Sequence, residues 1–165
     1  QAELAPPPDN IISPQGQDMR AQAKRVTKAR RSNYLNERLG LVIDGTGKQY
    51  DTLTNQASKL RQLGYETAMM FVNTDLDTAL ERNKTRDRRL PEDLVTKLWK
   101  DVQMNIGKFH NFFGKNMFVV DNSKGSNTSG VLNNMYKRMS EFAKKEILNP
   151  VAKKWIEKET QARSK

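Results

Sequence analysis

The sequence predicts an α/β domain built around a parallel β-sheet. Short, wholly apolar segments alternate with longer segments whose apolar residues recur at helical spacing, which is the order expected of strands joined by crossover helices. The apolar segments are continuous, as in strands buried on both faces. Three of them are predicted strands, at residues 41–43, 67–72 and 117–120. The sheet is small, since doubly wound folds usually carry about five strands or more.

The first 16 residues are expected to form an extended leader. They hold four of the six prolines and few large apolar side chains, a composition that resists both helix and sheet. A helix is predicted from Gln17 to Leu39, before Gly40, which suits the position after a helix end. Its apolar stripe is thin, so we expect it to be largely solvated. Seven of its residues are basic: Arg20, Lys24, Arg25, Lys28, Arg30, Arg31 and Arg38.

Further helices are predicted between and after the strands. An amphipathic helix should stop at Gly64, and Asn73-Thr74-Asp75 supplies N-cap chemistry for the next. Pro91 suits a first helical position, and one long helix is expected from there to Gly114. Its apolar residues are Leu94, Leu98, Val102, Ile106, Phe109 and Phe113.

Two more helices are expected after the third strand. The first carries Leu132, Met135, Met139 and Phe142, and the second follows Asn149-Pro150. The predicted organisation is a leader at 1–16, an α/β domain at 17–148 and a C-terminal helical extension at 149–165. A chain of 165 residues should form one core.

Composition narrows the classes of function. The formal charge of +10 favours anionic partners such as nucleotides, nucleic acid or acidic protein surfaces. The absence of cysteine excludes disulfides and thiolate chemistry, and a single histidine makes a His/Cys metal site implausible. The longest apolar runs are strand-sized, so we expect a soluble, cytoplasmic protein with no membrane partner.

The segment Leu41-Val-Ile-Asp-Gly-Thr-Gly47 carries the clearest chemistry. Phosphate-handling α/β proteins usually place a magnesium contact or a base at the carboxyl end of a buried strand, where Asp44 stands here. Four arginines follow about 40 residues later, at positions 82, 86, 88 and 89. A Gly-x-x-x-x-Gly-Lys-Ser/Thr loop is absent, because Gly47-Lys48 has Val at position 42 and Gln at position 49.

Several of these motifs resemble zeta-toxin-like P-loop kinases. Residues 41–47 resemble the strand of these kinases that ends in an acidic residue, and residues 71–92 resemble their strand, helix and arginine-bearing lid. Residues 99–121 are similar to kinases encoded by tailed bacteriophages, including those of cyanobacteria. The resemblance covers about residues 17–156. It implies the sheet of a P-loop kinase with additional C-terminal helices.

The resemblance also implies that part of the sheet is missing. In that family the phosphate loop and first strand lie upstream of the position of Gln17, and the first strand runs between the strands that match 41–43 and 67–72. Without it, these two would face a gap with unpaired backbone groups. We therefore expect a C-terminal segment, completed by an upstream segment or a partner chain. The alternative is a non-catalytic component refolded around a partner.

The implied activity is an ATP-dependent phosphotransferase, with ATP and Mg²⁺ as cofactors and this chain alone inactive. The phosphate acceptor is open: a nucleotide sugar, a nucleoside, a polynucleotide end or a protein. Asp44 is the candidate metal-proximal residue, with capping of the turn as the alternative. Thr46 is a candidate for cofactor binding, or else it holds the turn.

Arg82, Arg86 and Arg89 are the candidate catalytic residues. Guanidinium groups grip phosphate oxygens, so a closing lid would use them to stabilise transferred charge. The alternative is a solvated basic helix whose arginines pair with Glu81 or Asp87. Asp121 and Asn122 follow the third strand, where the family's loop flanks adenine, although any surface loop is equally polar.

A second hypothesis explains the charge without catalysis. A basic nucleic-acid-binding or virion-associated structural protein would use the helix from Gln17 and the basic tail from Lys137. Its affinity should fall steeply with salt. A phage-encoded protein would act in the host cytoplasm or be carried in the virion.

Overall fold

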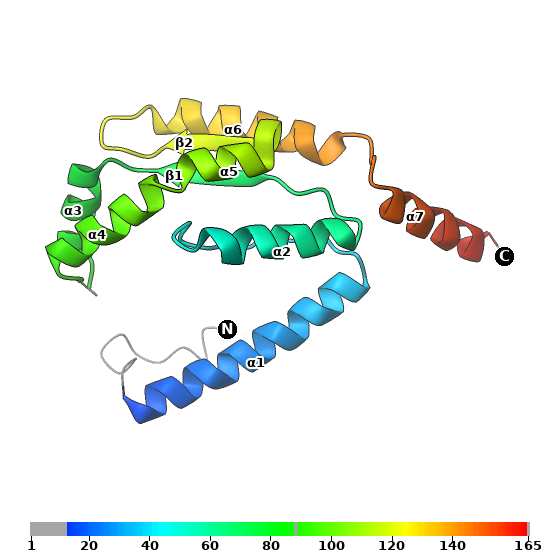
Figure 1. Cartoon of the computed structure of the whole chain (residues 1–165), viewed down its shortest axis with the longest axis horizontal. Coiled ribbons are helices and arrows are strands. Elements are labelled where there is room, and N and C mark those ends of the chain that lie inside the picture. Colours follow the sequence, from blue (N-terminus) through cyan, green and yellow to red (C-terminus); the bar gives the residue numbers. More distant parts are fainter. Residues whose placement is uncertain (1–12, 88, 165) are drawn as a thin grey trace. The chain divides into compact units, whose positions relative to one another are not determined.

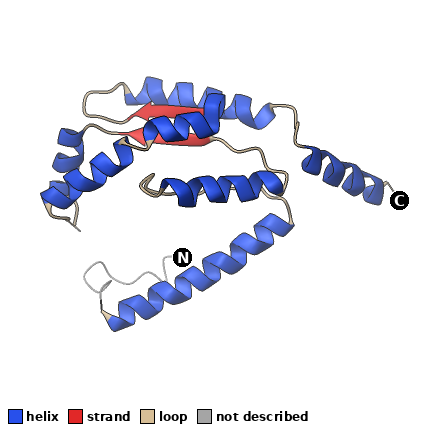
Figure 2. Ribbon diagram, viewed as in Figure 1, coloured by secondary structure: helices blue, strands red, loops and turns tan. Residues whose placement is uncertain are grey.

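The computed structural model describes residues 13–87 and 89–164. Helices and strands follow one another in the order α1, α2, β1, α3, α4, α5, β2, α6 and α7, with a 3₁₀ turn at Gly114–Asn116 before β2 (Figure 2). The described residues divide into two compact units. One holds 13–45 and residues 83–90, and the other holds Thr46–Arg82 and the chain from Pro91 onwards.

The second unit contains a parallel sheet, as the sequence predicts. Strand β1 (Met69–Asn73) pairs with β2 (Met117–Asp121) in parallel, from Met69 beside Met117 to Asn73 beside Asp121. Among the described residues this sheet has two strands. The predictions of strands at 67–72 and 117–120 are confirmed to within two residues, and so is the mixed α/β class.

The predicted strand at 41–43 is wrong. These residues have no regular secondary structure, Val42 is fully exposed and Ile43 is 43% exposed. A strand needs a neighbour for its backbone hydrogen bonds, and no described residue pairs with this segment. Continuous apolar character alone therefore did not make it a strand.

Helices cover the two faces of the sheet (Figure 1). On one face, helices α2 (Tyr50–Gln62) and α5 (Ile106–Phe113) pack around the buried residues Phe71, Phe109 and Met117. On the other face, α6 (Thr128–Lys144) packs against β2, where Phe118, Val120 and Met135 form the core. The apolar periodicity of α2 and α6 predicted both helices, which the structure confirms.

The long helix predicted from Pro91 to Gly114 is instead two helices. Helix α4 (Glu92–Gln103) ends before Met104, and α5 begins after Asn105. Asn105 is buried, and its Nδ2 donates to the carbonyl oxygens of Gly47 at 3.1 Å and Lys48 at 2.8 Å. The break turns this side chain toward the segment that precedes α2 and fixes that segment in place.

Helix α1 (Pro14–Asn36) starts within the predicted leader. The Ser13 hydroxyl accepts from the Gly16 amide at 3.0 Å and caps the helix, with Pro14 in its first turn. The assignment of residues 14–16 to an extended leader is therefore wrong, and the rest of the leader, 1–12, lies outside the described residues. Within α1, Gly16 is the one residue that is buried, so the expectation of a largely solvated helix is confirmed.

Two further helices complete the chain. Helix α3 (Leu76–Thr85) follows β1, and α7 (Pro150–Arg163) ends the described chain. Asn149 caps α7 and also donates to the Arg61 carbonyl at 2.8 Å, which attaches the start of α7 to the end of α2. None of the helices in the described ranges has the length and apolar character needed to cross a bilayer.

Candidate functional site

The carboxyl ends of β1 and β2 form one polar edge of the sheet. The Asn122 amide donates to the Asn73 carbonyl at 2.7 Å, and the Asp75 amide donates to the Ser123 hydroxyl at 3.0 Å. Trp99 and Gln103 of α4 also donate here, to the Thr74 carbonyl and the Asn73 side chain. In open α/β sheets, ligands bind outside this edge, so it is the natural candidate site.

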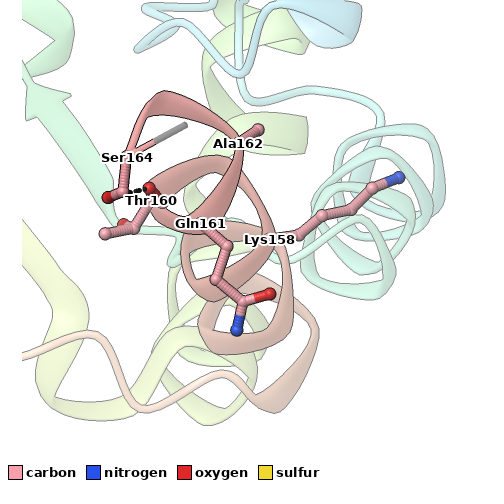
Figure 3. A pocket seen from close by; sticks show the side chains of 5 residues that line it. All are labelled: Lys158, Thr160, Gln161, Ala162 and Ser164. Carbon is pink, nitrogen blue, oxygen red and sulfur yellow. Dashed lines mark hydrogen bonds between the residues drawn. The ribbon is translucent and has the colours of Figure 1, made fainter.

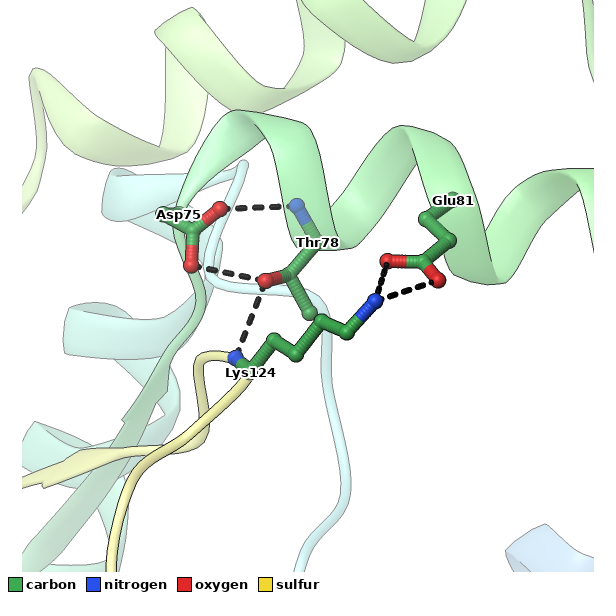
Figure 4. Close-up of polar contacts among 4 residues, drawn as sticks. All are labelled: Asp75, Thr78, Glu81 and Lys124. Carbon is green, nitrogen blue, oxygen red and sulfur yellow. Dashed lines mark hydrogen bonds and ion pairs between the residues drawn. The ribbon is translucent and has the colours of Figure 1, made fainter.

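The Asp75 carboxylate organises this edge (Figure 4). One oxygen accepts from the Thr78 amide at 2.7 Å and the other from the Thr78 hydroxyl, also at 2.7 Å. The Thr78 hydroxyl in turn accepts from the Lys124 amide at 3.0 Å, while the Lys124 ammonium reaches Glu81 at 2.9 Å. Asp75 thus caps α3 and joins it to the loop after β2.

Hydrogen bonding keeps both carboxylates at this edge ionised. The Thr78 amide, then the Thr78 hydroxyl and then the Ser123 hydroxyl lower the pKa of Asp75 to about 2. Ser123, first through its hydroxyl and then through its amide, lowers the pKa of Asp121. These carboxylates serve as hydrogen-bond acceptors.

Acid should weaken the protein through Asp75. Because its pKa is about 2 in the folded chain and 3.8 without these contacts, it contributes stability above pH 3.8 that is lost as the pH falls through 3.8 toward 2. Thermal unfolding should therefore show a steeper fall in Tm over this interval for the wild-type chain than for Asp75→Asn. Parallel profiles for the two proteins would contradict this.

The arginine-bearing segment after α3 is closed at its base. The buried Asn83 side chain accepts from the Leu90 amide at 3.0 Å and donates to the Leu90 carbonyl at 2.8 Å. Arg86 and Arg89 are exposed, and the Nε of Arg89 donates to the Arg86 carbonyl at 3.3 Å. The hydrogen bonds between Asn83 and Leu90 hold the two ends of the segment together, while the Arg86 and Arg89 side chains between them are exposed.

Asn83→Ala should release this segment. The variant loses two part-buried hydrogen bonds, so we expect a loss of about 1–3 kcal/mol in the free energy of unfolding and faster tryptic cleavage at Arg86 and Arg89. Urea unfolding and timed proteolysis measure the two effects. Asn133→Ala, at an exposed position of α6, is the control and should match the wild type. Unchanged cleavage in Asn83→Ala would show that the hydrogen bonds between Asn83 and Leu90 do not hold the segment.

The structure places the other predicted site residues as follows. Asp44 and Thr46 are exposed and lie in the irregular stretch before α2. No described residue of its own unit forms a hydrogen bond with the Asp44 side chain. Arg82 is half-buried on α3, and Arg88 lies outside the described residues. Asp121 and Asn122 do lie at the polar edge of the sheet.

Sequence reasoning missed most of the contacts that build this region. The sequence predicts N-cap chemistry for Asn73-Thr74-Asp75, and the structure shows that Asp75 is the residue that caps α3, through Thr78. The bond from the Asp75 amide to the Ser123 hydroxyl spans 48 residues, and the bond from the Lys124 amide to the Thr78 hydroxyl spans 46. No local pattern in the sequence predicts either bond, or the two hydrogen bonds between Asn83 and Leu90.

No metal-binding cluster accompanies this edge in the part of the chain that the structure describes. No three His, Asp or Glu side chains there gather as a metal-binding group. The hollow drawn in Figure 3 is lined by Lys158, Thr160, Gln161, Ala162 and Ser164, all at the end of α7. Residues of one helix end cannot enclose a substrate, so this hollow is a surface groove.

Comparisons with protein-family models, with curated proteins and with solved structures find no match to this chain. Inference about function therefore starts from the chemistry of the residues. The exposed arginines can bind phosphate oxygens, and the polar edge can position a loop beside a ligand.

Proposed function

We propose that this chain supplies the lid arginines and the acidic residue of an ATP-dependent phosphotransferase, and that a further segment or chain supplies its phosphate loop. The resemblance of residues 41–47 and 71–92 to zeta-toxin-like kinases supports this. So does the parallel pairing of β1 with β2, which is the sheet type of that fold.

The observation that carries the proposal is the exposure of β1. Met70 lies beside Phe118 and Val72 beside Val120 in the parallel register. Phe118 and Val120 are buried under α6, yet Met70 is 45% exposed and Val72 is 54% exposed. Parallel strands are normally covered on both faces, and no described strand pairs with the edge of β1 away from β2, so these apolar side chains indicate that a neighbour is missing there. A strand added there, with its covering element, would bury them.

The charged residues have distinct roles in this proposal. Mg²⁺ is usually bound through one or two protein carboxylates together with substrate phosphates and retained waters. One exposed carboxylate, that of Asp44, is therefore enough for this role. Arg82, Arg86 and Arg89 would bind the oxygens of the transferred phosphoryl group. Phosphoryl transfer asks the protein mainly for positioning and charge, and guanidinium groups supply both.

Nucleotide contacts are proposed for three further residues. Thr46 lies two residues after Asp44 and would contact the phosphates or the water around the metal ion. Asp121 and Asn122 follow β2, and the hydrogen bond from Asn122 to Asn73 holds that loop beside β1. A loop fixed in this way can flank the base of a nucleotide.

ATP hydrolysis tests the proposal without knowledge of the acceptor. The product of the complete open reading frame that encodes this chain should hydrolyse ATP slowly in the presence of Mg²⁺, and the chain alone should not. Arg86→Gln in that product should lower kcat by on the order of 10³-fold, whereas Arg163→Gln, an exposed arginine at the end of α7, should not change it. Full activity of the chain alone, or none in the complete product, would overturn the proposal.

A further inference from the structure

Helix α1 presents a row of basic side chains on one face. Arg20, Lys24 and Lys28 succeed one another at intervals of four residues, which places them one above the next on an α-helix. All three are exposed. A shallow hollow along the helix shows that they border one surface, because its lining consists of Arg20, Ala23, Lys24, Thr27, Lys28 and Arg31.

No acidic side chain of the described residues pairs with this row. Helix α1 contains six basic residues and a single acidic one, Asp18. Among the described residues, none forms an ion pair with Arg20, Lys24 or Lys28. Two lysines outside α1 do have acidic partners, since Lys124 pairs with Glu81 and Lys153 with Glu146. The row therefore keeps a concentrated positive potential that an external anion can neutralise.

We propose that the Arg20, Lys24 and Lys28 face of α1 binds the sugar-phosphate backbone of nucleic acid. Successive residues of the row rise by about 6 Å along the helix, so the row offers a line of cations to a polymer with a line of anions. The face carries no aromatic side chain on which a base could stack, so binding should be independent of sequence. This site goes beyond the proposed phosphotransfer and does not depend on it.

An anionic membrane fits this helix less well than nucleic acid does. Helices that lie in a membrane interface carry a wide apolar face rich in Trp, Phe and Leu. In α1 the larger apolar residues are few, at Met19, Val26, Tyr34 and Leu35. The helix can gain charge neutralisation from a lipid surface, but it has little apolar area to bury there.

Fluorescence anisotropy of the whole chain with labelled DNA duplex and with labelled single-stranded RNA, both of random sequence, tests the site. We expect binding to at least one of them, with log Kd rising steeply with log salt. Replacing Arg20, Lys24 and Lys28 together by Gln should weaken binding at least about tenfold and flatten the slope by about 3, or roughly 0.9 per lost phosphate contact. Gln is a good helix former, so circular dichroism should show that α1 is retained.

Two control variants separate a site from bulk charge. Replacing Lys154, Lys158 and Arg163 of α7 by Gln removes the same charge from another exposed helix and should leave most of the affinity. Arg20→Lys retains the charge and should bind as the wild type does. Equal losses in the two triple variants, no binding to either nucleic acid, or binding to phosphatidylserine vesicles alone would each overturn the proposal.

Discussion

Phe109→Ala is expected to lower the free energy of unfolding by about 3–5 kcal/mol. Phe109 is the most deeply buried side chain of the described core, with 0% exposure. Its ring centroid lies 5.2 Å from that of Tyr50, 6.4 Å from Phe113 and 6.5 Å from Phe71. Because these residues belong to α2, α5 and β1, the cavity left by the substitution would open where three elements meet.

Urea unfolding of the whole chain measures this loss. Phe112→Ala is the matched control, because Phe112 lies on the same helix and is half-buried. Its ring packs edge-on against Phe113 at 4.9 Å and beneath the Arg61 guanidinium at 4.5 Å, so its removal should cost less. Equal losses in the two variants would show that Phe109 is not the centre of this core.

Asn105→Ala is expected to have the second largest effect, about 2–3 kcal/mol, because it leaves two backbone acceptors without their donor. The Asn105 side chain donates to the carbonyls of Gly47 and Lys48 from the break between α4 and α5. Gly47 is buried and has a positive φ of +72°. A Cβ at this position would meet Phe71 and Val102, so this segment packs closely in the fold. Loss of the amide should loosen the chain just after Thr46.

Asn105→Asp provides the sharper comparison for this residue. It retains the size of the side chain but brings an oxygen toward two carbonyl oxygens, so it should destabilise the protein at least as much as Ala does. Amide hydrogen exchange at residues 46–49 should rise in both variants. Wild-type stability of Asn105→Asp would show that the side chain fills space and that its hydrogen bonds contribute little.

The strands show what an apolar run in a sequence can and cannot establish. Residues 67–72 and 117–120 were predicted from continuous apolar character, and each found the other as a parallel neighbour. Residues 41–43 have the same character but no described pairing partner, and they remain irregular with Val42 exposed. Strand formation depends on a neighbour, which the apolar pattern of a single segment does not reveal.

The helices show a similar limit. The apolar spacing from Leu94 to Phe113 runs unbroken through residues 104 and 105, so it predicts one helix where the structure has two. The reason is a tertiary contact, since Asn105 bonds to Gly47 at a separation of 58 residues. At the other end of the chain, Pro14 belongs to the predicted leader, but its position after Ser13 makes it a helix start.

The candidate site was predictable to the extent that it depends on local chemistry. Asp75 as a helix cap follows from its position before Leu76, and Asp121 and Asn122 follow from the end of β2. The hydrogen bonds between Asn83 and Leu90 and the bond from the Asp75 amide to the Ser123 hydroxyl depend on how the chain folds back. The roles proposed for Asp44, Arg82, Arg86 and Arg89 depend on the resemblance of their motifs.

Calorimetric titration of ATP with Mg²⁺ into the product of the complete open reading frame tests the proposed function most directly. We expect saturable binding by that product. We also expect a roughly tenfold weaker affinity, or about 1.4 kcal/mol, when Asp44→Asn removes the carboxylate proposed to lie beside the metal ion. Absence of binding by the complete product would contradict the proposed phosphotransferase, and unchanged affinity in Asp44→Asn would contradict the part assigned to this chain.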